Sequence, residues 1–157
     1  TFETATVIWT AGVQGAAIHG LDSKSLVERV ERIRVNQYNQ VVGYDNIFAI
    51  GDIASMESEK YPQGHPMMAQ PALQQGALLG ENLVKLLANK PMKPFEYNDK
   101  GSMATIGRNL AVVDLPKYHF SGLFAWFVWM FVHLFSLIGF KNKAVVFPKL
   151  GLQLRSF

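Results

Sequence analysis

The sequence predicts an α/β fold that continues into a helical, membrane-anchoring tail. Two short apolar runs, residues 4–10 and 46–50, each lead into a glycine turn, which is typical of buried strands in α/β proteins. Apolar side chains recur at helical spacing from residue 69 to about residue 88. Residues 120–140 form a run of 21 residues without Asp, Glu, Lys or Arg, rich in Phe and Trp.

Charge is distributed unevenly along the 157 residues. Residues 1–114 carry ten Lys or Arg and twelve Asp or Glu, whereas residues 115–157 carry five bases and no acid. Because these bases flank an apolar run, the tail suits an anionic membrane surface better than nucleic acid. The chain has no cysteine, which excludes disulfides and thiolate metal ligands, and we predict no metal site.

Before the helix, the expected elements are a strand, a hairpin and a second buried strand. They cover residues 4–10, 32–42 and 46–50. The predicted helix carries Pro71 in its first turn, where a missing N–H costs nothing, and Asn89-Lys90-Pro91 ends it. Two further strands, residues 102–106 and 110–115, form a hairpin to which we assign packing and no chemistry.

The strand at residues 46–50 ends in Gly51 and Asp52. Gly51 allows the backbone to turn and to approach a ligand closely. Asp52 then lies at the carboxyl end of the strand, where open α/β sheets bind ligands, and its carboxylate can accept hydrogen bonds from sugar-like hydroxyls. The alternative is a strand end at which Asp52 caps the following turn.

The helix start, Ala69-Gln70-Pro71-Ala72, has small residues on either side of Gln70-Pro71. Free N–H groups and the positive end of the helix dipole favour negative charge nearby. The alternative is an ordinary amphipathic helix whose glutamines are solvated.

These motifs resemble the type II NADH:quinone oxidoreductases, which are flavoproteins with two dinucleotide-binding domains. The resemblance rests on Trp9-Thr10-Ala11-Gly12, on Gly51-Asp52 about forty residues later, and on the Ala-Gln-x-Ala-x-Gln spacing that starts at Ala69. It covers most of the chain, from about residue 5 to residue 146. It implies the C-terminal part of the two-domain flavoprotein fold, with the membrane-anchoring tail.

The resemblance also implies roles for individual residues. Asp52 is expected to bind the ribityl chain of FAD, with Gly12 and Gly51 near the cofactor, and Ala72 to offer its backbone N–H to the isoalloxazine ring. A helix start near a flavin would stabilise its reduced, negatively charged form. Gln70 is expected to line the quinone site, with Leu73 and Gln74 beside it. His65 is a candidate proton donor to the quinone, against the alternative of an exposed loop histidine.

The family uses its C-terminal helices to lie in one leaflet of the membrane. For residues 120–140 we favour this monotopic arrangement over a true span, because aromatic residues prefer the interface and lysines lie on both sides of the run. The expected division is residues 1–13 for the end of the NADH domain, 14–116 for the second half of the FAD domain, and 117–157 for the anchor. Residues 147–157 do not resemble an aromatic anchor helix, because Pro148 and Gly151 interrupt them.

No Gly-x-Gly-x-x-Gly motif occurs, and the chain starts at Thr1 without a signal peptide, so we expect a C-terminal fragment that is inactive alone. Intact, it is expected to be a non-covalent FAD enzyme that passes two electrons from NADH to ubiquinone or menaquinone without pumping protons. The expected place is the cytoplasmic face of a bacterial inner membrane, with a homodimer as a hypothesis. The alternatives are a sulfide:quinone reductase, which needs catalytic cysteines, and a non-enzymatic membrane-tethered interaction module.

Overall fold

The chain divides between Asp99 and Lys100 into two compact units, each described by itself below. The computed structural model describes residues 3–8, 10, 12–16, 18 and 20–136. The expected division between the FAD-domain part and the anchor, at residues 116 and 117, stays a prediction. The compact unit that starts at Lys100 contains the hairpin at residues 102–115 together with the segment that follows it.

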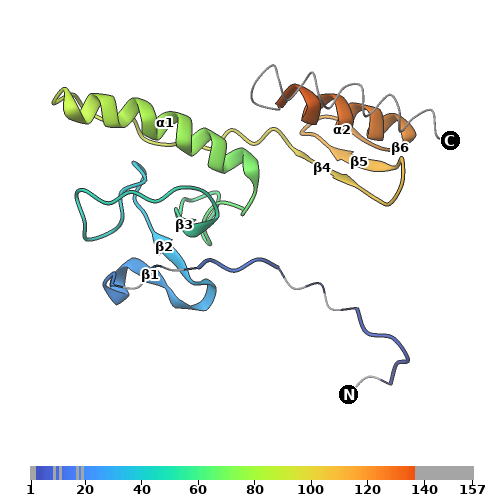
Figure 1. The fold of residues 1–157 in the computed structure, drawn as a ribbon, viewed down its shortest axis with the longest axis horizontal. Helices are drawn as coiled ribbons and strands as arrows, with labels where there is room; N and C mark the ends of the chain where they lie inside the picture. The colour runs from blue at the N-terminus through green and yellow to red at the C-terminus, as the bar shows by residue number, and fades with distance from the viewer. Residues whose placement is uncertain (1–2, 9, 11, 17, 19, 137–157) are drawn as a thin grey trace. The chain divides into compact units, whose positions relative to one another are not determined.

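The first unit contains a small sheet with the strand order β1-β2-β3 (Figure 1). β1, Leu26–Val27, pairs antiparallel with β2, Arg32–Arg34, and β2 pairs parallel with β3, Ala54–Ser55. Beyond β2 the chain turns back through a single bridge between Val35 and Val41, which confirms the expected hairpin in a shortened form. The core beside the sheet consists of Ile33, Val35, Val41, Ala49, Ala54, Met56 and Phe95.

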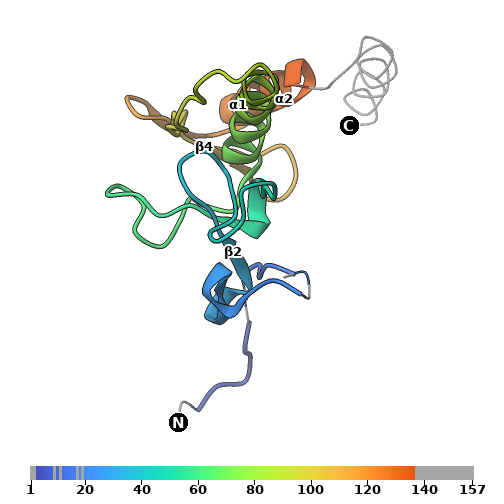
Figure 2. The same ribbon diagram turned by 90° about the vertical axis from the view of Figure 1, so that its left-hand side faces the viewer.

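The prediction of a buried strand at residues 4–10 is wrong. Within the described residues this segment forms no strand, and Val7 and Ile8 are 76% and 82% exposed. Figures 1 and 2 show it extending away from the sheet of the first unit. A strand requires partners for its backbone N–H and C=O groups, and no described segment pairs with this one.

The run at residues 46–50 is less regular than predicted. It makes one bridge, between Phe48 and Gln40, and Ala49 donates its N–H to the carbonyl of Asn39 at 3.0 Å. The chain then passes through a short 3-10 helix, Gly51–Ile53, into β3. A strand buried on both faces needs neighbours along both edges, and within the described residues this run pairs along one edge only.

The helix α1, Ala69–Leu87, confirms the prediction for residues 69–88. Its end is a Schellman motif, in which Lys90 donates its N–H to the carbonyl of Lys85 at 2.8 Å. Asn89 adopts the left-handed conformation that this motif requires, with a φ of 52°. Pro71 is buried in the first turn, where it removes no helical hydrogen bond.

Side-chain amides of α1 bind the segment that runs back along the helix (Figure 1). Gln74 exchanges two hydrogen bonds with the backbone of Asn98, at 2.9 and 3.0 Å. Asn82, which is fully buried, does the same with Lys93, at 2.8 Å each. These bonds place Phe95, which lies between the two anchored residues, in the core of the unit.

The second unit is an antiparallel sheet of β4, Ser102–Thr105, β5, Ala111–Asp114, and β6, His119–Gly122, with the helix α2, Leu123–Ser136, packed on it (Figure 1). The hairpin of β4 and β5 confirms the prediction, whereas β6 was not predicted. The apolar run at residues 120–140 therefore starts in a strand, and the helix begins only at Leu123. The core of the second unit consists of Ala111, Val113 and Ala125, with the partly buried Trp126 and Trp129 packed against it.

Within the described residues, neither helix combines the length and the hydrophobicity that crossing a membrane requires. The expectations for the rest of the apolar run and for residues 147–157 lie outside the described residues.

Candidate functional site

The turn at Gly51 and the first turns of α1 lie against each other. Gly51 donates its N–H to Oε1 of Gln75 at 2.7 Å, and Gln75 is 1% exposed. Gly51 has a φ of 72°, and a Cβ placed on it would lie 3.4 Å from Cβ of Ala72. Two motifs that the sequence singled out about twenty residues apart are thus one structural feature, which brings the predicted Gly51 and Ala72 together.

Asp52 follows in the same short 3-10 helix and is exposed to solvent. Its negative charge acts on Arg32, a buried residue of β2. Burial lowers the pKa of Arg32, and Asp52 opposes this by raising the pKa of Arg32. A carboxylate that is open to solvent, next to a glycine turn and a helix start, can accept hydrogen bonds from the hydroxyls of a ligand.

The helix start itself offers donors. Met68, at the N-cap position, supplies no side-chain hydrogen bond to the first turn. Gln70 and Ala72 are half-buried, and Leu73 is 64% exposed. The predicted Gln74 uses its amide to bind Asn98, so only its side-chain carbons remain for contact with a ligand. The structure therefore groups Gln70, Ala72 and Leu73 at the beginning of one helix.

Gly12 is not part of this group. It is exposed, and a Cβ placed on it would meet no atom of the described chain within 4 Å. Like residues 4–10, its segment pairs with no strand among the described residues. A position of Gly12 near the cofactor therefore stays a prediction from the family resemblance.

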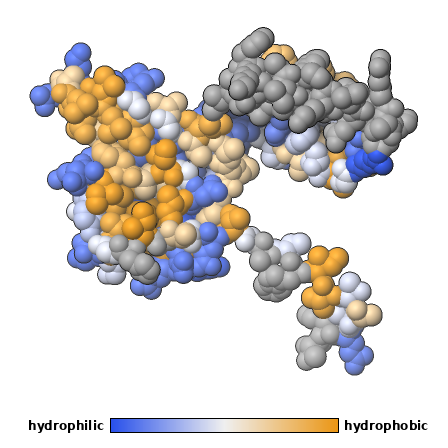
Figure 3. Space-filling view, in the orientation of Figure 1, coloured by the Kyte–Doolittle hydropathy of each residue, from blue (hydrophilic) through white to orange (hydrophobic). Residues whose placement is uncertain are grey.

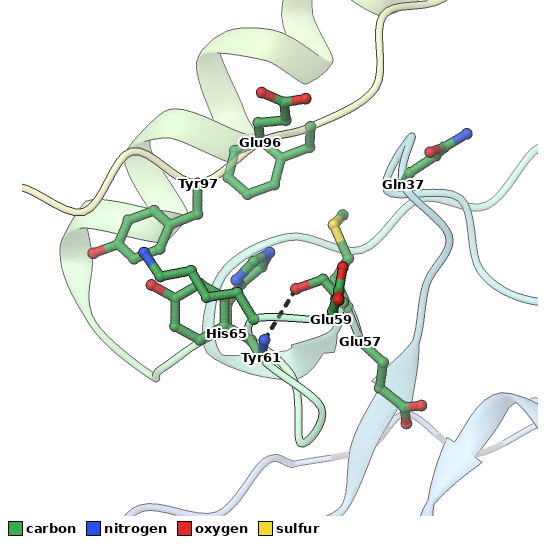
Figure 4. Close-up of a pocket in the computed structure, with 11 residues that line it drawn as sticks. Gln37, Glu57, Glu59, Tyr61, His65, Glu96 and Tyr97 are labelled. Carbon is green, nitrogen blue, oxygen red and sulfur yellow. Dashed lines mark hydrogen bonds between the residues drawn. The ribbon is translucent and has the colours of Figure 1, made fainter.

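A pocket of about 600 Å³ lies beside His65, in the loop that leads to α1 (Figure 4). The ring of His65 lies 4.9 Å from Tyr61, 5.4 Å from Phe95 and 5.6 Å from Tyr97, measured between ring centroids. His65 is 5% exposed, so the alternative of an exposed loop histidine is wrong. Glu57, Glu59 and Glu96 are the acidic residues of the pocket wall.

The environment of His65 favours a neutral imidazole. Burial lowers the pKa of His65, and the positive charge of Arg32 lowers it further. Within the described residues, Nδ1 of His65 and the hydroxyl of Tyr61 are buried without a hydrogen-bond partner. Burial, and then the nearby Asp99, raise the pKa of Tyr97. The imidazole of His65 and the hydroxyl of Tyr97 are therefore uncharged at neutral pH, in a pocket whose wall also contains the acidic residues Glu57, Glu59 and Glu96.

Two residues of this region, Arg32 and Gln75, were not predicted from the sequence to belong to the site. Gln75 lies three residues after Ala72, a spacing that places both on neighbouring faces of a helix, and this was a usable signal. Arg32 alternates with Ile33 and Arg34 in a strand, and nothing in that pattern distinguishes the buried arginine from the exposed one. Among the described residues, no three His, Asp or Glu side chains gather in a way that could hold a metal ion.

Two family models define the class of the chain, a pyridine nucleotide oxidoreductase of the flavoprotein type. Residues 1–76 match the family model of the pyridine nucleotide-disulphide oxidoreductases, and residues 100–150 match the NDH2 C-terminal domain. The chain belongs to the type II NADH:quinone oxidoreductase family.

Relatives agree with this assignment. The chain is 38% identical over 147 residues to the type II NADH:quinone oxidoreductase Ndh of Mycobacterium tuberculosis, covering 90% of this chain and 30% of that protein. It is 35% identical to NdhA of the same organism, with the same coverage. To the enzyme of Staphylococcus aureus it is 34% identical, over 65% of this chain and 25% of the relative. The chain thus spans about 30% of the length of the first two relatives.

In fold, the chain is similar to a structure of NDH2 from Plasmodium falciparum in complex with NADH. The TM-score is 0.68 at 18% identity, and the likeness covers 80% of this chain and 40% of that chain. At this identity the likeness concerns the fold alone.

Proposed function

We propose that the chain is part of a membrane-associated FAD enzyme that passes two electrons from NADH to a quinone without pumping protons. The observation that carries this proposal is the contact between the Gly51 turn and α1, where Gly51 donates to Gln75 at 2.7 Å. The relatives reported above are named NADH:quinone oxidoreductases, so we favour this function over a sulfide:quinone reductase or an interaction module.

The residues present fit a non-covalently bound FAD. Asp52 offers an exposed carboxylate for the ribityl hydroxyls, and Gly51 places no side chain between the turn and α1. Ala72 would offer its N–H to the ring, and the helix start would favour negative charge there. Bound there, FAD would supply the two-electron redox chemistry between NADH and a quinone. The protein supplies binding, orientation and electrostatics.

The quinone is proposed to bind at the start of α1. Gln70 can donate from its amide to a quinone oxygen, and Leu73, which is 64% exposed, offers an apolar contact for the ring or its chain. Gln74 would contribute only carbon atoms, because its amide is bound to Asn98. This arrangement accepts ubiquinone or menaquinone.

Membrane attachment is proposed through α2. One face of α2 packs on its sheet through Ala125 and Trp129. A second face is apolar and exposed, and consists of Leu123, Phe124, Phe127, Phe131 and Phe135. An apolar helix face of this kind fits a monotopic position in one leaflet, and we place the enzyme on the cytoplasmic face of a bacterial inner membrane, as a homodimer.

The test of the quinone role is Gln70→Ala in the full-length enzyme that carries this chain. We expect quinone reduction to fall at least about tenfold while reduction of the flavin by NADH persists, because the amide contacts the acceptor and not the hydride donor. Steady-state turnover with a quinone and stopped-flow bleaching of the flavin measure the two steps separately.

Gln63→Ala is the matched control, because Gln63 is an exposed glutamine of the preceding loop. It should change neither step. If Gln70→Ala leaves quinone turnover at the level of Gln63→Ala, Gln70 has no part in quinone binding and that assignment is withdrawn.

A further inference from the structure

Arg32 is a charged residue at the centre of the first unit. It lies on β2, is 5% exposed, and has β1 and β3 on either side of its strand. Arginine stays protonated at neutral pH even when burial lowers its pKa, so the interior contains a full positive charge. A buried charge is costly unless hydrogen bonds and opposite charge surround it, so its partners are informative.

Those partners are backbone carbonyls at the ends of two separate segments. Nη2 of Arg32 donates to the carbonyl of Ala54 and, at 3.0 Å, to the carbonyl of His65. Ala54 lies two residues after Asp52, and His65 lies four residues before the start of α1. One guanidinium therefore connects the Gly51-Asp52 turn with the loop that leads into α1.

The packing around the guanidinium leaves little freedom. Gly64 has a φ of 84°, and a Cβ placed on it would lie 3.3 Å from Nη1 of Arg32 and 2.8 Å from Oγ of Ser55. The loop before α1 thus lies directly on Arg32 and on β3. Asp52 supplies the opposite charge that raises the pKa of Arg32 against the effect of burial. A change in the position of Arg32 would be transmitted to both segments.

We propose that Arg32 is a positioning residue for the cofactor, which fixes the spacing between the Asp52 turn and the start of α1 so that both contact the same FAD molecule. This inference rests on the proposed function. Arg32 makes no contact with the cofactor itself in this proposal. It acts through its hydrogen bonds to the backbone of Ala54 and His65, which hold the two segments in place.

The test compares Arg32→Gln with Arg34→Gln in the full-length enzyme. Arg34 is the matched control, because it lies two residues away on the same strand and is exposed. The dissociation constant of FAD is measured by titrating the apoenzyme, at a temperature where circular dichroism shows each variant to be folded. We expect it to rise at least about tenfold in Arg32→Gln and to stay within about twofold of wild type in Arg34→Gln.

A purely structural role makes a different prediction. It lowers the unfolding temperature of Arg32→Gln but leaves the FAD affinity of the folded protein unchanged, and that result overturns the proposal. An equal loss of affinity in Arg34→Gln also overturns it, because charge alone would then explain the effect.

If Arg32→Gln does not fold, Arg32→Lys replaces it. Lysine keeps the charge but lacks the rigid, planar guanidinium whose Nη2 donates to both carbonyls, so FAD affinity should still fall several-fold. An unchanged affinity in that variant refutes the positioning role. Wild-type protein that binds no FAD at all would instead refute the proposed function, so the two failures are distinguishable.

Discussion

At the scale of single residues, the start of α1 shows that consecutive residues of a helix have very different surroundings. Leu73, Gln74 and Gln75 are consecutive, yet Leu73 is 64% exposed, Gln74 binds Asn98, and Gln75 is buried against Gly51. Each residue turns the helix by about 100°, so neighbours in sequence meet different surroundings. The glutamine that stabilises the Gly51 turn is therefore a different one from those expected to line the quinone site.

We expect His65 to make the stability of the enzyme depend on pH. Its folded-state pKa is lowered, so the unfolded chain binds a proton first as the pH falls. Its contribution is complete above about pH 6.5 and is lost below that value. We expect the unfolding temperature to fall between about pH 7 and about pH 5, and His65→Phe to make this dependence shallower. Thermal unfolding of the full-length enzyme at these pH values measures the difference.

His133→Phe is the control for this prediction, since His133 is exposed on α2. It should retain the pH dependence of the wild type. A His65→Phe variant whose unfolding temperature falls with pH as steeply as that of His133→Phe would show that His65 is protonated equally easily in the folded and unfolded chains.

At the scale of elements, the bonds between α1 and residues 93–98 explain how an extended segment without strand partners becomes ordered. Asn82 is fully buried and satisfies both backbone groups of Lys93. Asn82→Ala removes both hydrogen bonds and leaves a void at a fully buried position, so we expect the free energy of unfolding to fall by about 1–3 kcal/mol. Urea unfolding of the full-length enzyme, followed by circular dichroism, measures this change.

Glu81→Ala provides the comparison, because Glu81 is the exposed neighbour of Asn82 on the same helix. It should change the free energy by less than about 0.5 kcal/mol. Equal effects of the two substitutions would mean that the bonds to Lys93 contribute nothing to stability.

The elements that the sequence predicted correctly are those whose signals are local. The periodicity of α1 and the Gly107-Arg108-Asn109 turn of the β4–β5 hairpin are contained in a few consecutive residues. The strand expected at residues 4–10 failed because a strand depends on a partner distant in sequence. For the same reason β6 was missed, since its four residues merge into the apolar run that continues as α2.

For the candidate site, sequence reasoning named two segments that the structure brings together, but not the contacts between them. Gly51 and Ala72 were both expected at the cofactor, and they lie together in the structure. The residues that connect these segments, Arg32 and Gln75, were not named. The spacing of Gln75 from Ala72 was a usable signal, whereas Arg32 has no sequence signature, because its burial is decided by packing between distant parts of the chain.

At the scale of the whole molecule, apolar surface remains exposed in both units. Figure 3 shows apolar side chains gathered over α1, where Leu73, Val84 and Leu87 are among the exposed residues. Contiguous apolar surface of this kind marks contact with another protein surface, a ligand or a membrane. The two helices differ in the charges near them in the sequence. Of the two, only α2 lies in the basic, acid-free part of the chain, residues 115–157.

This difference leads to a prediction about which surface contacts the membrane. Phe124 and Phe131 are 70% and 49% exposed on α2, and inserting such side chains into lipid contributes about 1.5–3 kcal/mol each. Phe124→Glu combined with Phe131→Glu should weaken binding of the full-length enzyme to anionic phospholipid vesicles at least about tenfold, measured by co-sedimentation. Leu87→Glu, at an 86% exposed position of α1, introduces the same kind of change in the other unit and should leave vesicle binding intact. Should the Leu87→Glu enzyme lose the vesicles while the double variant retains them, the first unit and not α2 contacts the lipid.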